Sequence, residues 1–233
     1  MNKTEITIVM QGYLSPQSVM AMQCYSKFGE VILSTWEGQN TAGFDPSRTI
    51  VTPYPAAGPF NGQNVYFQAL SSCIGLRKST SNFSVKVRAD MIASDLSKVL
   101  FKLENAPDKL ISISHLFRRD CHPTKFHPSD HLLAARTSDL LAGFELCRKR
   151  CEAHVQVIDG FMCHWAEQWI ATSFLSSKGI KIDENNSKEI MRANTDVVGA
   201  CDLGNFRWKS VAYNGIELCN PYLDTIIHRI EDL

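Results

Sequence analysis

The sequence predicts an α/β fold in which a mostly parallel sheet is flanked by helices. Strand-like and helix-like segments alternate along the first third of the chain, as in sheets whose strands are joined by helical crossovers. Residues 83–88 show period-two alternation, with Phe83, Val85 and Val87 apolar and the residues between them polar. The length of 233 residues, with 44% hydrophobic and 21% charged residues, suits one globular domain.

The remaining elements follow from local patterns. Ser15-Pro16 is expected to start a helix that ends near Phe28, since serine is a good cap and proline suits the first helical position. Ser94 is expected to cap another helix, and the Pro- and Gly-rich stretch 53–62 is expected to be a loop. Other strands are expected at 5–11, 30–36, 49–52 and 109–114, and other helices at 63–77, 138–153, 166–178 and 222–233.

Composition excludes several classes of protein. Lys plus Arg equals Asp plus Glu, at 24 each, and no face interleaves basic with aromatic residues, so nucleic acid is not an expected partner. The eight cysteines contain no C-x-x-C pair, and Glu5 interrupts the short apolar N-terminal run. We therefore expect reduced thiols and a cytoplasmic protein. The signatures of dinucleotide-binding, P-loop, serine-hydrolase and zincin sites are absent.

The first candidate site is Arg88-Ala89-Asp90, directly after the period-two strand. Ligands of open α/β sheets bind at the carboxyl ends of strands, so these side chains are expected at a crevice. A carboxylate there suits Mg²⁺ or Mn²⁺ on a diphosphate, and Arg88 could contact a phosphate. A solvated strand end with a local ion pair is the alternative.

The second candidate is PTKFHPSDH, residues 123–131, which lies in a histidine-rich segment. Its histidines match no zinc spacing, and two prolines make it a loop rather than a helix that could carry ligands. Ser129 and Asp130 could instead bind the hydroxyls of a sugar. They could also only cap the following helix or strand.

The third candidate is Ala166-Glu167-Gln168-Trp169, near a helix start. Glu167 could serve as a general base for an acceptor hydroxyl, with Trp169 stacking on a sugar ring. The helix dipole also favours a carboxylate in the first turn, so a purely structural role is the alternative.

Six segments in this order resemble the WavE lipopolysaccharide-synthesis family over roughly residues 5–180. They are ITIVMQGYL (6–14), EVILSTWEGQN (30–40), QNVYFQALSSCIGL (63–76), KVRAD (86–90), FHPSDHLLAAR (126–136) and AEQW (166–169). The resemblance implies a single-domain glycosyltransferase of GT-A-like fold, with a nucleotide-sugar-binding half at about 1–90. The acceptor-binding half would span about 91–233 and include the C-terminal helix.

The resemblance also implies site residues. The donor would be bound by Gln11, Gly12, Thr35, Trp36, Glu37, Asn64, Gln68 and Arg88, and the acceptor by His127, Ser129 and Trp169. Asp90 would hold Mn²⁺ or Mg²⁺ on the donor diphosphate. The usual motif is D-x-D, and Arg88 stands in place of its first acid, so the metal requirement is open.

The expected activity is transfer of a hexose from a nucleotide sugar to a lipid-linked or oligosaccharide acceptor of lipopolysaccharide or capsule. Glu167 or Asp130 would be the base if the configuration inverts. Any membrane association would be peripheral, at the cytoplasmic face of the inner membrane. The alternatives are a degenerate sugar- or nucleotide-binding module and, with less support, a hydrolase.

Overall fold

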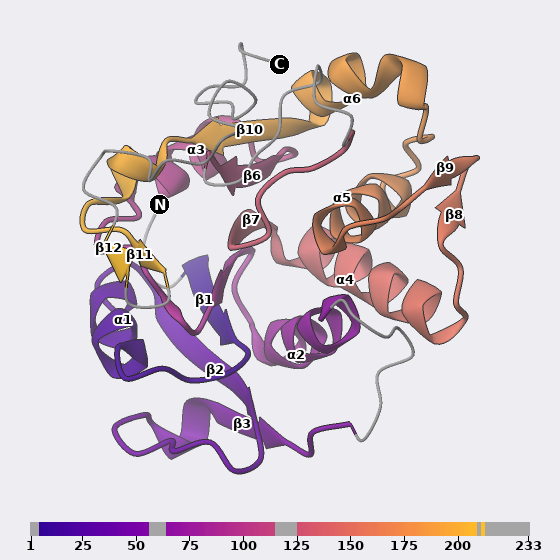
Figure 1. Cartoon of the computed structure of the whole chain (residues 1–233). Helices are drawn as coiled ribbons and strands as arrows, with labels where there is room; N and C mark the ends of the chain where they lie inside the picture. Colours follow the sequence, from indigo (N-terminus) through magenta and orange to yellow (C-terminus); the bar gives the residue numbers. More distant parts are fainter. Residues whose placement is uncertain (1–4, 56–63, 115–124, 209–210, 213–233) are drawn as a thin grey trace.

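The computed structural model describes residues 5–55, 64–114, 125–208 and 211–212. Its centre is a seven-stranded sheet of order β10-β6-β7-β4-β1-β2-β3 (Figure 1). β7 runs antiparallel to β4 and β6, and the other pairings are parallel. The strands are β1 Ile6–Gln11, β2 Glu30–Trp36, β3 Thr49–Thr52, β4 Phe83–Arg88, β6 Leu110–Ile113, β7 Leu132–Arg136 and β10 Thr195–Val198. The predicted α/β class with a mixed, mostly parallel sheet is confirmed.

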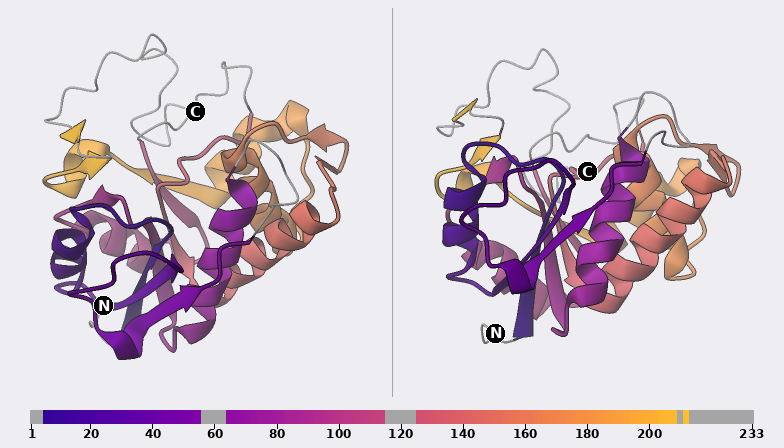
Figure 2. Two further views of the ribbon diagram at one scale, coloured as in Figure 1. Left: turned by 60° about the horizontal axis from the view of Figure 1, so that its bottom comes forward. Right: turned by 90° about the horizontal axis from the view of Figure 1, so that it is seen from below.

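Helices cover both faces of the sheet. The views in Figures 1 and 2 place α1 and α3 on one side and α2, α4 and α5 on the other. The helices are α1 Ser18–Tyr25, α2 Val65–Lys78, α3 Ser97–Asn105, α4 Thr137–Glu152, α5 Ala166–Ser177 and α6 Ser187–Asn194. Short elements complete the described chain: strands β5 Met91–Ile92, β8 Val157–Ile158, β9 Phe161–Met162, β11 Arg207–Trp208 and β12 Val211–Ala212, and 3₁₀ turns at Pro46–Arg48, Glu184–Asn186 and Ala200–Leu203.

The alternation within β4 assigns its two faces to two core clusters. Val85 and Val87 pack with the apolar side chains of α1 and α3. Ser84 and Lys86 are fully buried on the opposite face, where α2, α4 and α5 form the second cluster. The face that the sequence marks as polar is therefore also covered, because a parallel sheet of this kind has helices on both sides.

The close packing of α2 on the sheet depends on Gly75. A Cβ at this position would lie 2.4 Å from Cγ1 of Val9 and 3.3 Å from Cβ of Ser34. Only a residue without a side chain lets the helix approach β1 and β2 at this distance. The approach brings the first turns of α2 to the carboxyl ends of these strands.

Two predicted helix caps are wrong, because neither Ser15 nor Ser94 is the capping residue of its helix. Ser15-Pro16 forms a turn, and α1 begins at Ser18, whose hydroxyl accepts a hydrogen bond from the Ser15 amide at 2.8 Å. α3 begins at Ser97, and the side chain of Asp95 accepts from its amide at 2.8 Å. Ser94 instead accepts from the amide of Asn205 at 2.7 Å, so its hydroxyl joins two distant segments.

Some expectations fall outside the described residues. They concern the helix at 222–233 and most of the loop at 53–62. The other predicted helices lie within one or two residues of their expected bounds, and α5 ends at Ser177, two residues before Gly179, whose φ is +77°. Among the described residues, no helix is both long and apolar enough to span a membrane.

Candidate active site

The strand register brings the predicted residues to one edge of the sheet. Gln11 at the end of β1 pairs with Arg88 at the end of β4 and with Ser34 in β2. The amide of Arg88 donates to the carbonyl of His131 at 3.1 Å, where the chain enters β7. Because β7 is antiparallel, its amino end meets the carboxyl ends of β1 and β4. The loop with Ser129 and Asp130 is thereby placed beside Arg88-Ala89-Asp90.

Arg88 and Asp90 form a two-point ion pair. Nε of Arg88 donates to Oδ1 of Asp90 and Nη2 to Oδ2, both at 2.9 Å. The arginine side chain is 29% exposed and the aspartate 17%. Burial lowers the pKa of Arg88, but the hydrogen bonds and charge of Asp90, together with the charges of Asp130 and Glu167, outweigh it and raise the pKa above its ordinary value. The guanidinium therefore remains charged and holds the carboxylate.

Helix α1 fixes the backbone of this tripeptide. The Gln17 side chain donates to the carbonyl of Asp90 at 2.9 Å, and the Ser18 hydroxyl donates to that of Ala89 at 2.6 Å. The Tyr25 hydroxyl donates to Met91 at 3.0 Å. The segment 88–91 is thus held from the face opposite α2, and its conformation does not depend on the ion pair alone.

The donor set does not fit a resident metal ion in this arrangement. Both carboxylate oxygens of Asp90 face the guanidinium of Arg88. Within the described segments there is no group of three or more His, Cys, Asp or Glu side chains arranged to hold a metal. We therefore assign no chemical step to a metal, and the role of Asp90 as a metal ligand stays a prediction.

Asp130 is the centre of a buried polar cluster. Its carboxylate Oδ2 accepts from Nε2 of Gln68 at 2.7 Å, and its Oδ1 lies 3.6 Å from Nδ1 of His131. Its carbonyl accepts from Nζ of Lys86. The preceding residue, Ser129, is fully buried, and its carbonyl accepts from the hydroxyl of Ser112 at 2.9 Å. Asp130 therefore has a fixed backbone and an oriented carboxylate.

Lys86 was not among the candidates from sequence. It is fully buried, and its ammonium lies 5.9 Å from the ring centroid of Phe144. Burial lowers the pKa of Lys86 to about 8, although the charges of Asp130, Asp90 and Glu167 act in the opposite direction and that of Arg88 adds to the lowering. A lysine on the polar side of a strand is normally expected to be exposed to solvent, so no sequence signal points to this role.

Glu167 reaches the same cluster from α5. Its Oε2 lies 3.5 Å from Nε2 of His127, whose side chain is mostly buried. The side chain of Gln168 donates to the carbonyl of Lys125 at 2.8 Å and so joins the loop to the helix start. The charge of Glu167 acts on both Lys86 and Arg88. The three carboxylates predicted separately, at positions 90, 130 and 167, thus all stabilise the charged forms of the same two cations.

Trp169 does not face this site. Its side chain is 1% exposed and belongs to the core cluster between α4 and α5. The guanidinium of Arg150 lies 4.8 Å from its ring centroid. The predicted stacking of Trp169 on an acceptor sugar is therefore wrong in this arrangement, because α4 covers the indole.

A group of aromatic side chains lies next to the polar cluster, at the ends of β1, β2 and β3. We call Tyr13, Trp36, Tyr54 and Phe67 the aromatic ledge. Tyr54 stacks on Phe67 with centroids 4.8 Å apart and lies 5.7 Å from Tyr13. Tyr13 and Tyr54 are 53% and 42% exposed, whereas Trp36 is buried beneath them. A hydrogen bond to Tyr54, followed by burial, raises the pKa of Tyr13 to about 12.

The predicted donor residues divide between the ledge and the polar cluster. Gln11 accepts from the hydroxyl of Ser71 at 2.8 Å, and Gln68 contacts Asp130 as described. The Thr35 hydroxyl is buried and donates to the carbonyl of Gly12 at 2.8 Å, so it shapes the β1 turn. Gly12 has φ +101°, which favours glycine, and a Cβ there would meet no atom within 4 Å. Glu37 and Asn64 are exposed.

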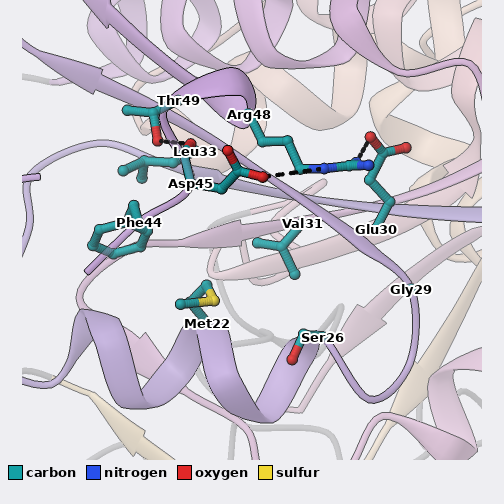
Figure 3. Close-up of a pocket in the computed structure, with 10 residues that line it drawn as sticks. All are labelled: Met22, Ser26, Gly29, Glu30, Val31, Leu33, Phe44, Asp45, Arg48 and Thr49. Carbon is teal, nitrogen blue, oxygen red and sulfur yellow. Dashed lines mark hydrogen bonds and ion pairs between the residues drawn. The ribbon is translucent and has the colours of Figure 1, made fainter. Parts of the chain in front are cut away.

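A pocket elsewhere in the fold is separate from this site. Figure 3 shows an open pocket of about 260 Å³ between α1 and the amino ends of β2 and β3. Arg48 bridges Glu30 and Asp45 at its rim. Glu30 begins β2 and Thr49 begins β3, so the pocket lies at the opposite edge of the sheet from Gln11 and Arg88. Ligands of open α/β sheets bind at the other edge.

Fold and site define an α/β protein with a cluster of charged side chains at the carboxyl edge of a mostly parallel sheet. The family model described as WavE lipopolysaccharide synthesis matches residues 6–148. The chain belongs to this family, and the predicted resemblance is confirmed over these residues; the AEQW segment at 166–169 lies beyond them.

Solved structures give a more distant likeness. The apo form of the glycosyltransferase GlyE of Streptococcus pneumoniae TIGR4 is 12% identical, with a TM-score of 0.43, over 78% of this chain and 46% of that one. A second structure of the same glycosyltransferase is 14% identical, with a TM-score of 0.43, over 74% of this chain and 44% of that one. The chain thus spans less than half the length of these glycosyltransferases. No curated protein matches.

Proposed function

We propose that this chain is a glycosyltransferase that moves a hexose from a nucleotide-sugar donor to a lipid-linked or oligosaccharide acceptor of lipopolysaccharide or capsule. One observation carries the proposal: at the edge of the sheet where ligands bind, Arg88 pairs with Asp90 and Lys86 donates to the carbonyl of Asp130, and the charge of Glu167 acts on both cations. Membership of a lipopolysaccharide-synthesis family supports the glycan acceptor.

The donor would extend from the aromatic ledge to Arg88. A nucleobase can stack on the exposed rings of Tyr13 and Tyr54, and base–aromatic stacking contributes roughly 1–3 kcal/mol per base. The diphosphate would then lie toward the guanidinium of Arg88, which suits a phosphate because of its planar fork of donors. Stabilising the negative charge of the leaving nucleoside diphosphate is the main chemical demand of the transfer.

Glu167 is the better candidate for the base that takes the acceptor proton. Its side chain is 17% exposed, compared with 8% for Asp130, so an acceptor hydroxyl can approach it more easily. His127 at 3.5 Å can orient it. Asp130, with its carboxylate held by Gln68, would bind sugar hydroxyls beside His127. Ser129 is fully buried, so the predicted contact of its hydroxyl with the acceptor is wrong in this arrangement. These roles apply to an inverting reaction.

Donor binding is the first test. Purified protein should show a higher melting temperature with at least one of the UDP-, GDP-, CMP- and dTDP-sugars, each measured with Mn²⁺ and with EDTA. Manganese assistance through Asp90 predicts a larger shift with Mn²⁺ that D90N loses. D196N is the matched control, because Asp196 is also 17% exposed and ion-paired, with Lys102, but is the second residue of β10, near the amino edge of the sheet. A full panel without any shift would refute the proposal.

A non-catalytic sugar- or nucleotide-binding module is the second candidate. This candidate is favoured by Arg88, which stands in place of the first acid of the usual D-x-D motif and forms an ion pair with the carboxylate of Asp90. Such a module would bind a donor, be indifferent to EDTA and release no product. Product analysis with donor plus acceptor, compared with donor plus water, separates transferase, module and hydrolase.

A further inference from the structure

We propose that Lys86 is a positioning residue, which holds the backbone of Asp130 so that the Asp130 carboxylate is presented to the bound sugar. The inference rests on the proposed function and deepens it, because it assigns a role to a buried cation that neither the motif nor the family match singles out.

The contacts of Lys86 point to one target. The side chain is fully buried, and its Nζ donates to the carbonyl oxygen of Asp130, 44 positions away in the sequence. Burying an ammonium is costly, and a core position against Phe144 would be filled more cheaply by an apolar residue. The hydrogen bond that compensates for this cost goes to the carbonyl of Asp130, in the loop of the candidate site. The role of Lys86 therefore concerns this loop.

Two anchors together orient Asp130. Lys86 holds its carbonyl, and Gln68 holds its carboxylate at 2.7 Å. These anchors come from β4 and α2, which are rigid elements on two sides of the loop. A third contact, from Ser112 in β6 to the carbonyl of Ser129, fixes the preceding residue. Without Lys86 the peptide after Asp130 keeps only long contacts, from Nε2 of Gln68 to the Asp130 carbonyl at 3.5 Å and from the His131 amide to the Ser129 hydroxyl at 3.4 Å. We therefore expect the loop to loosen and the carboxylate of Asp130 to lose its fixed orientation.

The charges that face Lys86 are consistent with a positioning role. Asp130, Asp90 and Glu167 stabilise its charged form, and Arg88, two residues along the same strand face, opposes it. Lys86 therefore also offsets part of the repulsion among three carboxylates. It does not lie at the surface of the site, so it contacts no substrate in this arrangement.

The test compares K86M, K86R and a control, R150M. Arg150 is a second buried cation against an aromatic ring, but it bonds Thr172 and Ser173 rather than the loop at 125–131. In K86M, hydrogen exchange of peptides covering 125–131 should rise at least tenfold relative to peptides of α4. K86R, which keeps donors and charge, should restore much of the protection. R150M should not affect 125–131 selectively.

Turnover gives the second measurement. K86M should lower kcat at least tenfold and change the donor KM less than twofold, since the aromatic ledge and Arg88 are untouched; K86R should recover part of the kcat. Unchanged exchange at 125–131 in K86M, or a uniform increase equal to that in R150M, would overturn the inference. The exchange measurement needs no donor, so it decides the role of Lys86 even if no nucleotide sugar binds and the proposed function fails.

Discussion

Because Arg88 and Asp90 form a two-point ion pair, substitutions at these two positions should have non-additive effects on the free energy of unfolding. Hydrogen bonds to charged groups contribute roughly 1.5–3 kcal/mol when buried, and exposed ion pairs only about 0–1 kcal/mol. With side chains 29% and 17% exposed, this pair lies between those limits. Replacing Arg88 with Met removes the cation beside Asp90, and we expect a loss of about 2 kcal/mol.

The two single substitutions should differ. Asp90→Asn should cost only about 1 kcal/mol, because Arg88 still faces the charges of Asp130 and Glu167. The double variant should cost about 2 kcal/mol, which gives a coupling energy of about 1 kcal/mol. For a chain of this length, R88M should lower the melting temperature by about 4–8 °C.

Urea denaturation of the wild type, the two single variants and the double variant measures the coupling. The cycle of K102M and D196N is the control, because that pair has nearly the same exposure, 31% and 17%, but only one hydrogen bond between the partners, at 2.7 Å. Its coupling should be below about 0.5 kcal/mol. If the effects of R88M and D90N are additive within about 0.3 kcal/mol, the pair does not hold Asp90, and our reading of the site is refuted.

Three further predictions concern the surroundings of the site. Burial lowers the pKa of Lys86 from 10.5 to about 8. Between these pH values the unfolded chain binds more protons than the folded one, so the free energy of unfolding should rise with pH. In urea denaturation, the wild type should gain roughly 2 kcal/mol relative to K86M between pH 7.5 and 9.5. Gly75→Ala should lower the melting temperature despite the better helix propensity of alanine, because its Cβ would lie 2.4 Å from Val9 and overpacking costs about 1–3 kcal/mol; an unchanged transition would contradict the packing argument. Tyr54→Ala should weaken nucleotide-sugar binding about fivefold to a hundredfold in calorimetry, whereas an equal affinity would exclude the aromatic ledge from the donor site.

The parts of the fold that were predicted from sequence depend on local patterns. The alternation in residues 83–88 defines β4 and places Arg88 and Asp90 at its end, without knowledge of any other strand. The helices α2, α4 and α5 were predicted because their apolar spacing persists over several turns. The start of α1 was missed because two serines three residues apart, Ser15 and Ser18, both fit a cap position.

The parts that were missed depend on pairing between distant segments. Residues 132–136 read LLAAR, a short apolar run that suits a buried helix or a strand equally well. They form β7, inserted antiparallel between β4 and β6. This insertion brings Asp130 to Lys86, and the helix that follows it, α4, helps to bury the polar face of β4, because Phe144 lies against Lys86. No local pattern in either segment carries that information.

The ion pair also decides how the donor's charge can be balanced. A bound diphosphate would add negative charge beside Asp90, Asp130 and Glu167, and Arg88 is already engaged by Asp90. In EDTA, D90N should therefore bind a nucleotide sugar more tightly than the wild type, because it releases the guanidinium; one charge-assisted hydrogen bond of about 1.4 kcal/mol corresponds to roughly tenfold. D196N should leave the affinity unchanged. Weaker binding by D90N in EDTA would show that Arg88 does not replace the missing acid. If Mn²⁺ then strengthened binding only while Asp90 was present, the carboxylate would be a metal ligand despite its pairing in the free protein.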